Sequence, residues 1–192
     1  MNTNNEFPEK SIFKAYDIRG VVGKNLNDSS VVQIGKSIGT KALRENQKSI
    51  CVGYDGRLSS PHMFKLLSKG LLSTGINVTS IGLVTTPMLY FSTHQLKTKS
   101  GIMITGSHNP PDYNGFKIVI NDETLSTDGI QKLYKIIIEK SYLTGKGEMR
   151  SANIKLPYLK KIYKDIKLAR PISIAIDCGN GAASVCAEEL YK

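Results

Sequence analysis

A serine and a histidine stand side by side in the stretch GIMITGSHNPPDYNGFKIVI, which runs from residue 101 to residue 120. Ser107 carries a hydroxyl group that can form a covalent bond to an acyl or phosphoryl group, and His108 carries an imidazole that can act as a general acid or base. An apolar run precedes the pair, and two prolines and an Asn-Gly turn follow it. This pattern predicts that Ser107 lies in a loop just past a strand end, where side chains can project into a cleft.

Acyl transfer is the first chemistry to compare with these residues. The serine elbow of a hydrolase has the pattern G-x-S-x-G between a strand and a helix, whereas prolines follow here where the helix would start. His108 is adjacent to Ser107 in sequence, which rarely allows it to face the serine as a base. The other two histidines, His62 and His94, fall in helical patterns and are expected to be structural or surface residues. A Ser-His-Asp hydrolase is therefore a poor fit.

Phosphoryl transfer is a better fit, because it needs an oxygen carrier, positive charge around it and a metal ion. Gly106 allows close approach to the backbone, and Asn109 offers local hydrogen bonds. Lys117 lies in the apolar strand that follows, where alternation places it on the face opposite Phe116. This lysine could be a counter-charge for phosphate or an acid/base, or alternatively an exposed edge-strand lysine that discourages aggregation.

Alternating strand and helix patterns surround this loop. Strands are expected over residues 11–16, 49–54, 77–83, 101–105 and 116–120, and helices over residues 30–44, 60–74, 86–96 and 127–141. Helices between strands require crossover connections, so most of the sheet should be parallel. The last two strands have no helix between them, which predicts one antiparallel strand at an edge. The expected fold is a three-layer α/β/α domain with a mixed, mostly parallel sheet.

A second unit is expected to begin near residue 146. A polar, glycine-containing linker over residues 143–152 leads to a basic helix over residues 156–168, a strand over residues 172–177 and a glycine turn before another helix. The turn CGNGAAS lacks the third glycine of a dinucleotide-binding fingerprint, so a tight strand-to-helix turn is the better interpretation. One strand and two helices cannot bury a full core. We therefore expect residues 1–145 to form a first domain and residues 146–192 to begin a second, in a longer protein.

Composition restricts the possible partners. The net charge is +10, but residues 131–170 hold 11 of the 26 Lys and Arg residues against 3 acidic ones. This excess is typical of a solvated helix face, and no aromatic-plus-basic signature accompanies it, so we expect no nucleic-acid partner. No apolar run reaches the length of a membrane helix, so we expect no membrane association. The three cysteines form no C-x-x-C pair, which favours reduced thiols and a cytoplasmic protein.

Four motifs together resemble one known family. The segment TGSHNPPDYNGFK resembles the phosphoserine loop of the α-D-phosphohexomutases, and FKAYDIRGVVG and VGYDGRLSS resemble two further motifs of that family. The segment AIDCGNGAAS resembles the start of its second domain. The motifs occur in the family's order across nearly the whole chain, and they are most similar to the bacterial phosphomannomutase/phosphoglucomutase branch.

The resemblance implies a reaction and the roles of the loop residues. Ser107 would carry the phosphoryl group, pass it to a phosphosugar to give a hexose 1,6-bisphosphate, and take back the other phosphate after that intermediate turns round. The bisphosphate would also serve as an activator. His108 would have a catalytic role, and with Asn109 it would shape the loop and contact phosphate or substrate.

The resemblance also implies roles for side chains outside the loop. Tyr16 and Arg19 would reach the same cleft and bind substrate, with Arg19 also contributing to catalysis. Lys117 would bind substrate and act as acid/base beside the phosphoserine. For Asp55 and Arg57, a turn that contains an Asp–Arg pair is the simpler interpretation.

Part of the implied site is absent from this sequence. In the family, Mg²⁺ bridges the phosphoserine and three aspartates of a D-G-D-x-D-R-type loop, which this chain lacks, and Asp165 and Asp177 supply no substitute. Through its phosphate Ser107 would supply one metal ligand, too few for stable binding. We therefore expect this chain to need the missing C-terminal domains of the same polypeptide and to be inactive alone. The alternatives are a phosphoglucosamine mutase and a non-catalytic phosphosugar-binding or assembly module.

Overall fold

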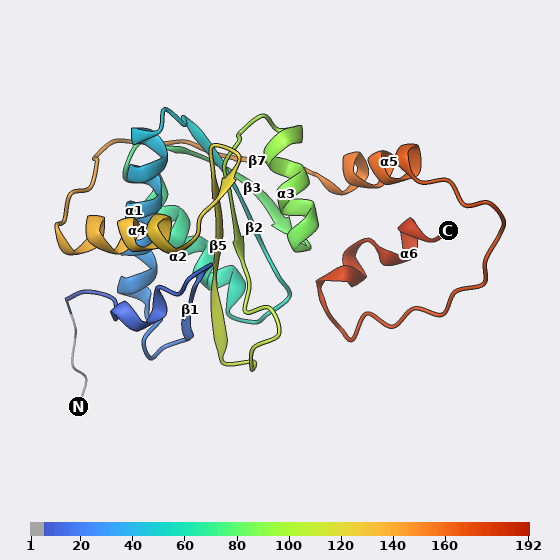
Figure 1. The fold of residues 1–192 in the computed structure, drawn as a ribbon, viewed down its shortest axis with the longest axis horizontal. Coiled ribbons are helices and arrows are strands. Elements are labelled where there is room, and N and C mark those ends of the chain that lie inside the picture. The colour runs from blue at the N-terminus through green and yellow to red at the C-terminus, as the bar shows by residue number, and fades with distance from the viewer. Residues whose placement is uncertain (1–5) are drawn as a thin grey trace.

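A seven-stranded mixed sheet forms the centre of the molecule (Figure 1). The structure, a computed structural model, describes residues 6–192. Six strands lie in the order β1-β5-β4-β2-β3-β7, and β6 pairs with the outer end of β5. The strands are β1 (Ile18–Val21), β2 (Ser49–Tyr54), β3 (Asn77–Leu83), β4 (Gly101–Ile104), β5 (Tyr113–Ile120), β6 (Glu123–Thr124) and β7 (Met149–Ser151).

Helices cover both faces of this sheet, so the predicted three-layer α/β/α architecture is confirmed (Figure 1). One face is covered by α1 (Asp28–Arg44), α2 (Ser60–Leu72) and α4 (Thr127–Ile138). The other is covered by α3 (Thr86–Gln95) and by α5 (Lys155–Asp165) at its far end. Strand residues alternate between the two layers: Val52 and Ile102 belong to the first core cluster, whereas Cys51 and Met103 belong to the second.

Strand directions follow from the connections. β2 is parallel to both β3 and β4, and helices α2 and α3 make the crossovers. β5 is antiparallel to β4, as the loop without a helix predicted. Its expected place at an edge was wrong, because β1 pairs antiparallel with its other side through Ile18 and Phe116. This extra strand makes β5 an interior strand.

The strand expected over residues 11–16 was also wrong. A 3₁₀ helix occupies Lys10–Ile12, and the first strand begins at Ile18. Ile12 and Phe13 are neighbours in sequence and are both buried in the same cluster. A half-buried strand would place consecutive residues on opposite faces, so a tight helical turn satisfies this apolar pair better.

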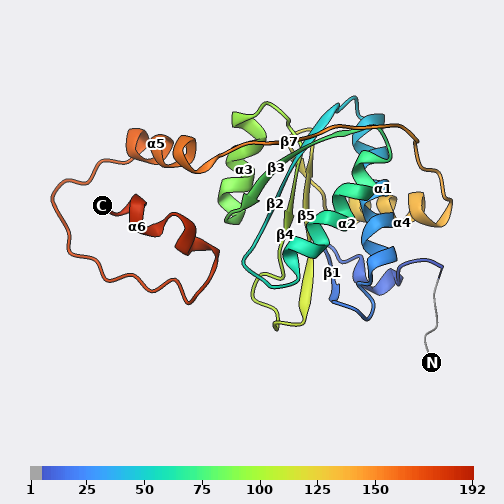
Figure 2. The same cartoon turned by 180° about the vertical axis from the view of Figure 1, so that it is seen from behind.

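The C-terminal part differs from expectation in two places. The polar linker contains β7, which adds a parallel strand to β3 at the edge of the sheet. The strand expected over residues 172–177 has no strand partner in the structure, and Ile172, Ile174 and Ile176 are each about half exposed. After this segment the chain returns toward α5 through a 3₁₀ helix (Ala182–Val185) and α6 (Ala187–Leu190), as seen from behind in Figure 2. Across residues 6–192, no helix is both long enough and apolar enough to span a bilayer.

Candidate functional site

A cleft of about 540 Å³ lies at the carboxyl ends of the parallel strands. β2, β3 and β4 end at the same edge of the sheet, and the chain leaves β2 toward α2 on one face and β3 toward α3 on the other. Open α/β sheets bind ligands outside this edge, where the connections diverge. The lining residues come from the segments after all three strands and from a distant turn: Asp55–Arg57, Thr85, Thr86, Met103, Thr105, Ser107, Asn109, Pro111 and Gly179–Ala182.

Ser107 lies in this cleft with an unusual backbone. Its φ is +52°, in the left-handed region that residues with a side chain seldom occupy. Its amide donates to the hydroxyl oxygen of Thr105 at 2.8 Å, and its side chain is exposed. The Ser107 Oγ lies 3.4 Å from the Nδ1 atom of the exposed His108, a long contact between adjacent residues. The prediction that Ser107 lies in a loop past a strand end and opens into a cleft is confirmed.

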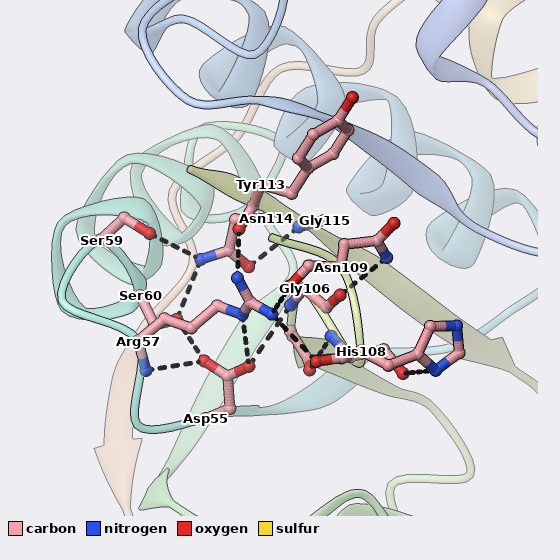
Figure 3. A network of polar contacts seen from close by, with 12 residues as sticks. Asp55, Arg57, Ser59, Ser60, Gly106, His108, Asn109, Tyr113, Asn114 and Gly115 are labelled. Atoms are coloured by element: carbon pink, nitrogen blue, oxygen red, sulfur yellow. Dashed lines mark hydrogen bonds and ion pairs between the residues drawn. The ribbon is translucent and has the colours of Figure 1, made fainter. Parts of the chain in front are cut away.

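Arg57 reaches across from the segment after β2 and binds the backbone of the serine loop (Figure 3). Its Nη2 atom donates to the carbonyl oxygens of Ser107 at 2.9 Å and Asn109 at 2.7 Å. Its Nη1 atom donates to the carbonyl oxygens of Pro110 at 2.6 Å and Tyr113 at 3.0 Å. One guanidinium therefore connects four carbonyl groups of the loop that holds the serine.

Asp55 neutralises this guanidinium and attaches it to α2. One carboxylate oxygen lies 3.5 Å from the Nε atom of Arg57 and accepts from the amide of Gly106 at 3.3 Å. The other accepts from the Arg57 amide at 3.1 Å and from the Ser60 hydroxyl at 2.6 Å. The buried amide of Asn114 donates to the hydroxyl oxygens of Ser59 and Ser60, each at 2.9 Å (Figure 3). The network thus ties the loop to the start of α2 and to β5.

Gly106 is required by this arrangement, although its backbone has an ordinary φ. A Cβ atom at this position would lie 2.3 Å from Cζ and 2.4 Å from Nε of Arg57. Only a residue without a side chain leaves room for the guanidinium this close to the loop. The glycine that the sequence suggested for close backbone approach therefore makes room for an arginine of the protein itself.

The structure brings together some of the other predicted site residues. Arg19 lies opposite Gly115 in the β1–β5 pair, and Lys117 follows two residues later, so both cations lie on the same sheet face. Lys117 is directly opposite Met103, which lines the cleft. The Nη1 atom of Arg19 approaches the side-chain oxygen of Asn109 at 3.5 Å. Positive charge is therefore present on the face of the sheet that leads to the serine loop.

Tyr16 is a predicted site residue that the structure leaves outside the cleft: its side chain is 72% exposed and does not line it. Arg19, His108 and Lys117 are not among the residues that line the cleft either. Lys117 itself is half-buried, which argues against a purely exposed edge lysine, and β5 is an interior strand. The alternative of an aggregation-blocking edge residue therefore loses its basis.

The residues present do not make a metal centre by themselves. Within residues 6–192, no group of three or more His, Cys, Asp or Glu side chains is placed to hold a metal ion. The carboxylate beside the cleft, Asp55, already accepts three hydrogen bonds and faces a guanidinium, so its oxygens are occupied. A Mg²⁺ ion would have to obtain most of its ligands from elsewhere.

Sequence reasoning missed two contributors to the site. The Asp55–Arg57 ion pair exists, but the expected simple turn understates Arg57, which binds the loop 50 residues away. The second is the turn at Gly179–Ala182, which lines the same cleft from the C-terminal part of the chain. One sequence signal could have pointed to Arg57. Asp-Gly-Arg follows β2 and a glycine loop follows β4, and adjacent parallel strands end side by side, so the two segments can meet.

The sequence is similar to proteins of one family. A family model described as phosphoglucomutase/phosphomannomutase, alpha/beta/alpha domain I, matches residues 10–143. The chain is 47% identical to a phosphomannomutase/phosphoglucomutase of Pseudomonas aeruginosa, covering 95% of this chain and 39% of that protein. It is 46% identical to a phosphoglucomutase of Neisseria meningitidis serogroup B, covering 95% of this chain and 40% of the relative. The chain therefore spans about two fifths of the length of these relatives.

Solved structures share the fold. A phosphoglucomutase/phosphomannomutase family protein from Burkholderia thailandensis superposes with a TM-score of 0.91 at 40% identity, over 95% of this chain and 42% of that one. A structure of a phosphomannomutase homologue from Thermus thermophilus superposes with a TM-score of 0.72 at 23% identity, over 81% of this chain and 36% of that one, and shows the fold alone.

Proposed function

Because this chain belongs to the phosphoglucomutase/phosphomannomutase family, we propose that it is the phosphoserine-bearing N-terminal part of a phosphohexomutase. The full-length enzyme would interconvert the 1-phosphate and 6-phosphate of a hexose, with mannose and glucose phosphates as substrates. The observation that carries the proposal is the placement of Ser107: exposed, in a fixed loop, at the carboxyl ends of the strands where such folds bind ligands. Residues 1–145 would form this domain, and residues 146–192 would begin the next.

In the proposed reaction Ser107 carries a phosphoryl group at the start and at the end of each turnover. The bond between phosphorus and Ser107 Oγ breaks while a sugar hydroxyl oxygen forms a bond to the same phosphorus, and the hydroxyl proton leaves. The resulting hexose 1,6-bisphosphate turns round, and its other phosphate returns to Ser107 Oγ. Lys117 is the candidate to take up and return the proton, and Arg19 is the candidate to hold the sugar phosphate, because both lie on the sheet face that carries Met103, a residue lining the cleft.

Mg²⁺ is proposed as the metal of the full-length enzyme, where it would stabilise the charge on the transferring phosphoryl group. Among the described residues no group of carboxylates could hold this ion, so a phosphate on Ser107 would be their contribution. The carboxylate ligands would come from further domains of the full-length enzyme. The same domains would determine which hexose phosphate is the preferred substrate. For these reasons we propose that the 192-residue chain is inactive alone. We also propose a cytoplasmic environment, which the three free cysteines support.

Phosphorylation mapping tests this proposal. The full-length enzyme is incubated with glucose 1,6-bisphosphate and analysed by intact mass and peptide mapping; we expect one phosphoryl group on Ser107. Ser107→Ala should lose the label and the mutase activity, whereas Ser29→Ala, which changes an exposed serine on α1, should keep both. A phosphate that maps elsewhere, together with full activity of Ser107→Ala, would refute the assignment. Measurable mannose 6-phosphate formation by the 192-residue chain would refute its proposed inactivity.

A further inference from the structure

Arg57 has no donor left for a ligand. Its Nη1 and Nη2 atoms make four hydrogen bonds to backbone carbonyl oxygens, and its Nε atom faces the Asp55 carboxylate. A guanidinium has five N–H groups and no acceptor. All five are therefore directed at the protein itself, although the residue lies in a cleft that would hold phosphate.

The carbonyl groups that Arg57 binds are the ones that fix the loop. They belong to Ser107, Asn109, Pro110 and Tyr113, which run from the serine to the first residue of β5. Hydrogen bonds from an ionised donor are roughly twice as strong as neutral ones, and the planar guanidinium adds geometric specificity. A lysine ammonium could not span four carbonyl groups in this way.

Ser107 needs such support because of its backbone conformation. A left-handed φ of +52° is unfavourable for a serine, and conformations of this kind persist only where the surroundings over-determine them. Two contacts hold the peptide units on either side of the Ser107 Cα: the amide donates to Thr105, and the carbonyl accepts from Arg57. The direction of the serine side chain depends on that φ.

We infer that Arg57 is a positioning residue: it holds Ser107 in the left-handed conformation that presents the hydroxyl to the cleft, and it does not bind the phosphate. The start of α2 holds the Arg57 side chain in place, because the Asp55 carboxylate pairs with the guanidinium and also accepts a hydrogen bond from the Ser60 hydroxyl of that helix. This role in turnover rests on the proposed function, but the effect on the loop does not.

The loop is tested first on the 192-residue chain, whose large buried cores predict independent folding. NMR and hydrogen exchange are recorded for the wild type, Arg57→Lys and Arg57→Gln, with Arg44→Gln as the matched control. Arg44 also donates to a backbone carbonyl, that of Ser141, but on the far surface. We expect both Arg57 variants to lose the left-handed ¹³C shifts of Ser107. The Asn109 and Tyr113 amides should exchange more than about tenfold faster, the change expected for losing one charge-assisted hydrogen bond.

Kinetics of the full-length enzyme then separate positioning from phosphate binding. For a positioning residue, kcat should fall about 10²-fold in both variants with KM little changed, because a displacement near 1 Å suffices for such a loss. A loop that stays ordered in both variants overturns the inference. A raised KM with unchanged kcat also overturns it, since Arg57 would then be a phosphate ligand. If circular dichroism shows that Arg57→Gln does not fold, the loop order, kcat and KM of Arg57→Lys alone test the inference. An altered loop in an enzyme that carries no phosphoserine would reject the proposed function and leave the loop result intact.

Discussion

Replacing Gly106 by alanine should disrupt the serine loop through Arg57 alone. The new Cβ would lie 2.3 Å from the guanidinium carbon, so the group must retreat by roughly 1 Å to reach ordinary van der Waals distance. The hydrogen bonds from Arg57 to the carbonyl oxygens are 2.6 to 3.0 Å long, and such a shift would stretch those that lie along its direction beyond hydrogen-bonding distance. Losing two of the four would cost about 3 kcal/mol. The lower entropy of the unfolded alanine variant offsets less than about 1 kcal/mol. We therefore expect the free energy of unfolding to fall by about 2 kcal/mol.

The assay is urea unfolding followed by far-UV circular dichroism, because the chain has no tryptophan. Gly56→Ala is the matched control, since Gly56 is the neighbour of Arg57 in sequence and has no positive φ. A Cβ atom at Gly56 would meet nothing within 4 Å. The free energy of unfolding of this control should therefore change by less than about 1 kcal/mol.

A double-mutant cycle identifies the cause. In an Arg57→Gln background the Gly106→Ala substitution has no guanidinium to displace, so it should cost almost nothing, and the coupling energy should be about 2 kcal/mol. If Gly106→Ala destabilises equally in both backgrounds, the clash is not with Arg57 and the reasoning is refuted. A stable Gly106→Ala variant with an intact loop would contradict it as well.

Three further predictions concern the scaffold. Gly70→Ala should lower the free energy of unfolding by about 1 to 2 kcal/mol, measured by urea unfolding, since its Cβ would lie 2.2 Å from the carbonyl oxygen of Val32 where α2 crosses α1, and overpacking outweighs the gain in helix propensity. Asn114→Ala should cost about 2 to 3 kcal/mol in the same assay, because it leaves the buried Ser60 hydroxyl without a donor; a loss below about 0.5 kcal/mol would show that the network is not stabilising. Burial raises the pKa of the Cys51 thiol from 9.0 to about 11, so the unfolded chain ionises first: stability should be retained below pH 9 and fall by up to about 3 kcal/mol as the pH rises to 11, and Cys51→Ala should remove this part of the slope.

Local patterns predicted most of the scaffold. The alternation of strands and helices, and turn residues such as Pro61 at the start of α2, sufficed for the positions of β2, α2, β3, α3 and β4. Errors occurred where pairing between distant segments decides the outcome. The first strand begins at Ile18 because β5 offers it an edge, and β7 forms within a polar stretch because β3 has a free side. Neither edge is visible in the local sequence.

The candidate site shows the same division. The sequence by itself determined that a serine stands in a stiff loop just after an apolar strand, because Gly106, the two prolines and the Asn-Gly turn are local signals. It also identified Lys117 and Arg19 as cations near that loop, through alternation and through a family resemblance.

Only the tertiary structure decided what holds the serine. Arg57 and Ser107 are far apart along the chain, and they meet because β2 and β4 are parallel neighbours whose carboxyl ends lie side by side. The hydrogen bonds of Arg57 to the serine loop therefore depend on how the strands are ordered in the sheet, and the sequence near Arg57 does not determine that order. For the same reason the sequence indicated only that Gly106 allows close approach to the backbone, whereas the folded chain shows that the approaching group is the guanidinium of Arg57.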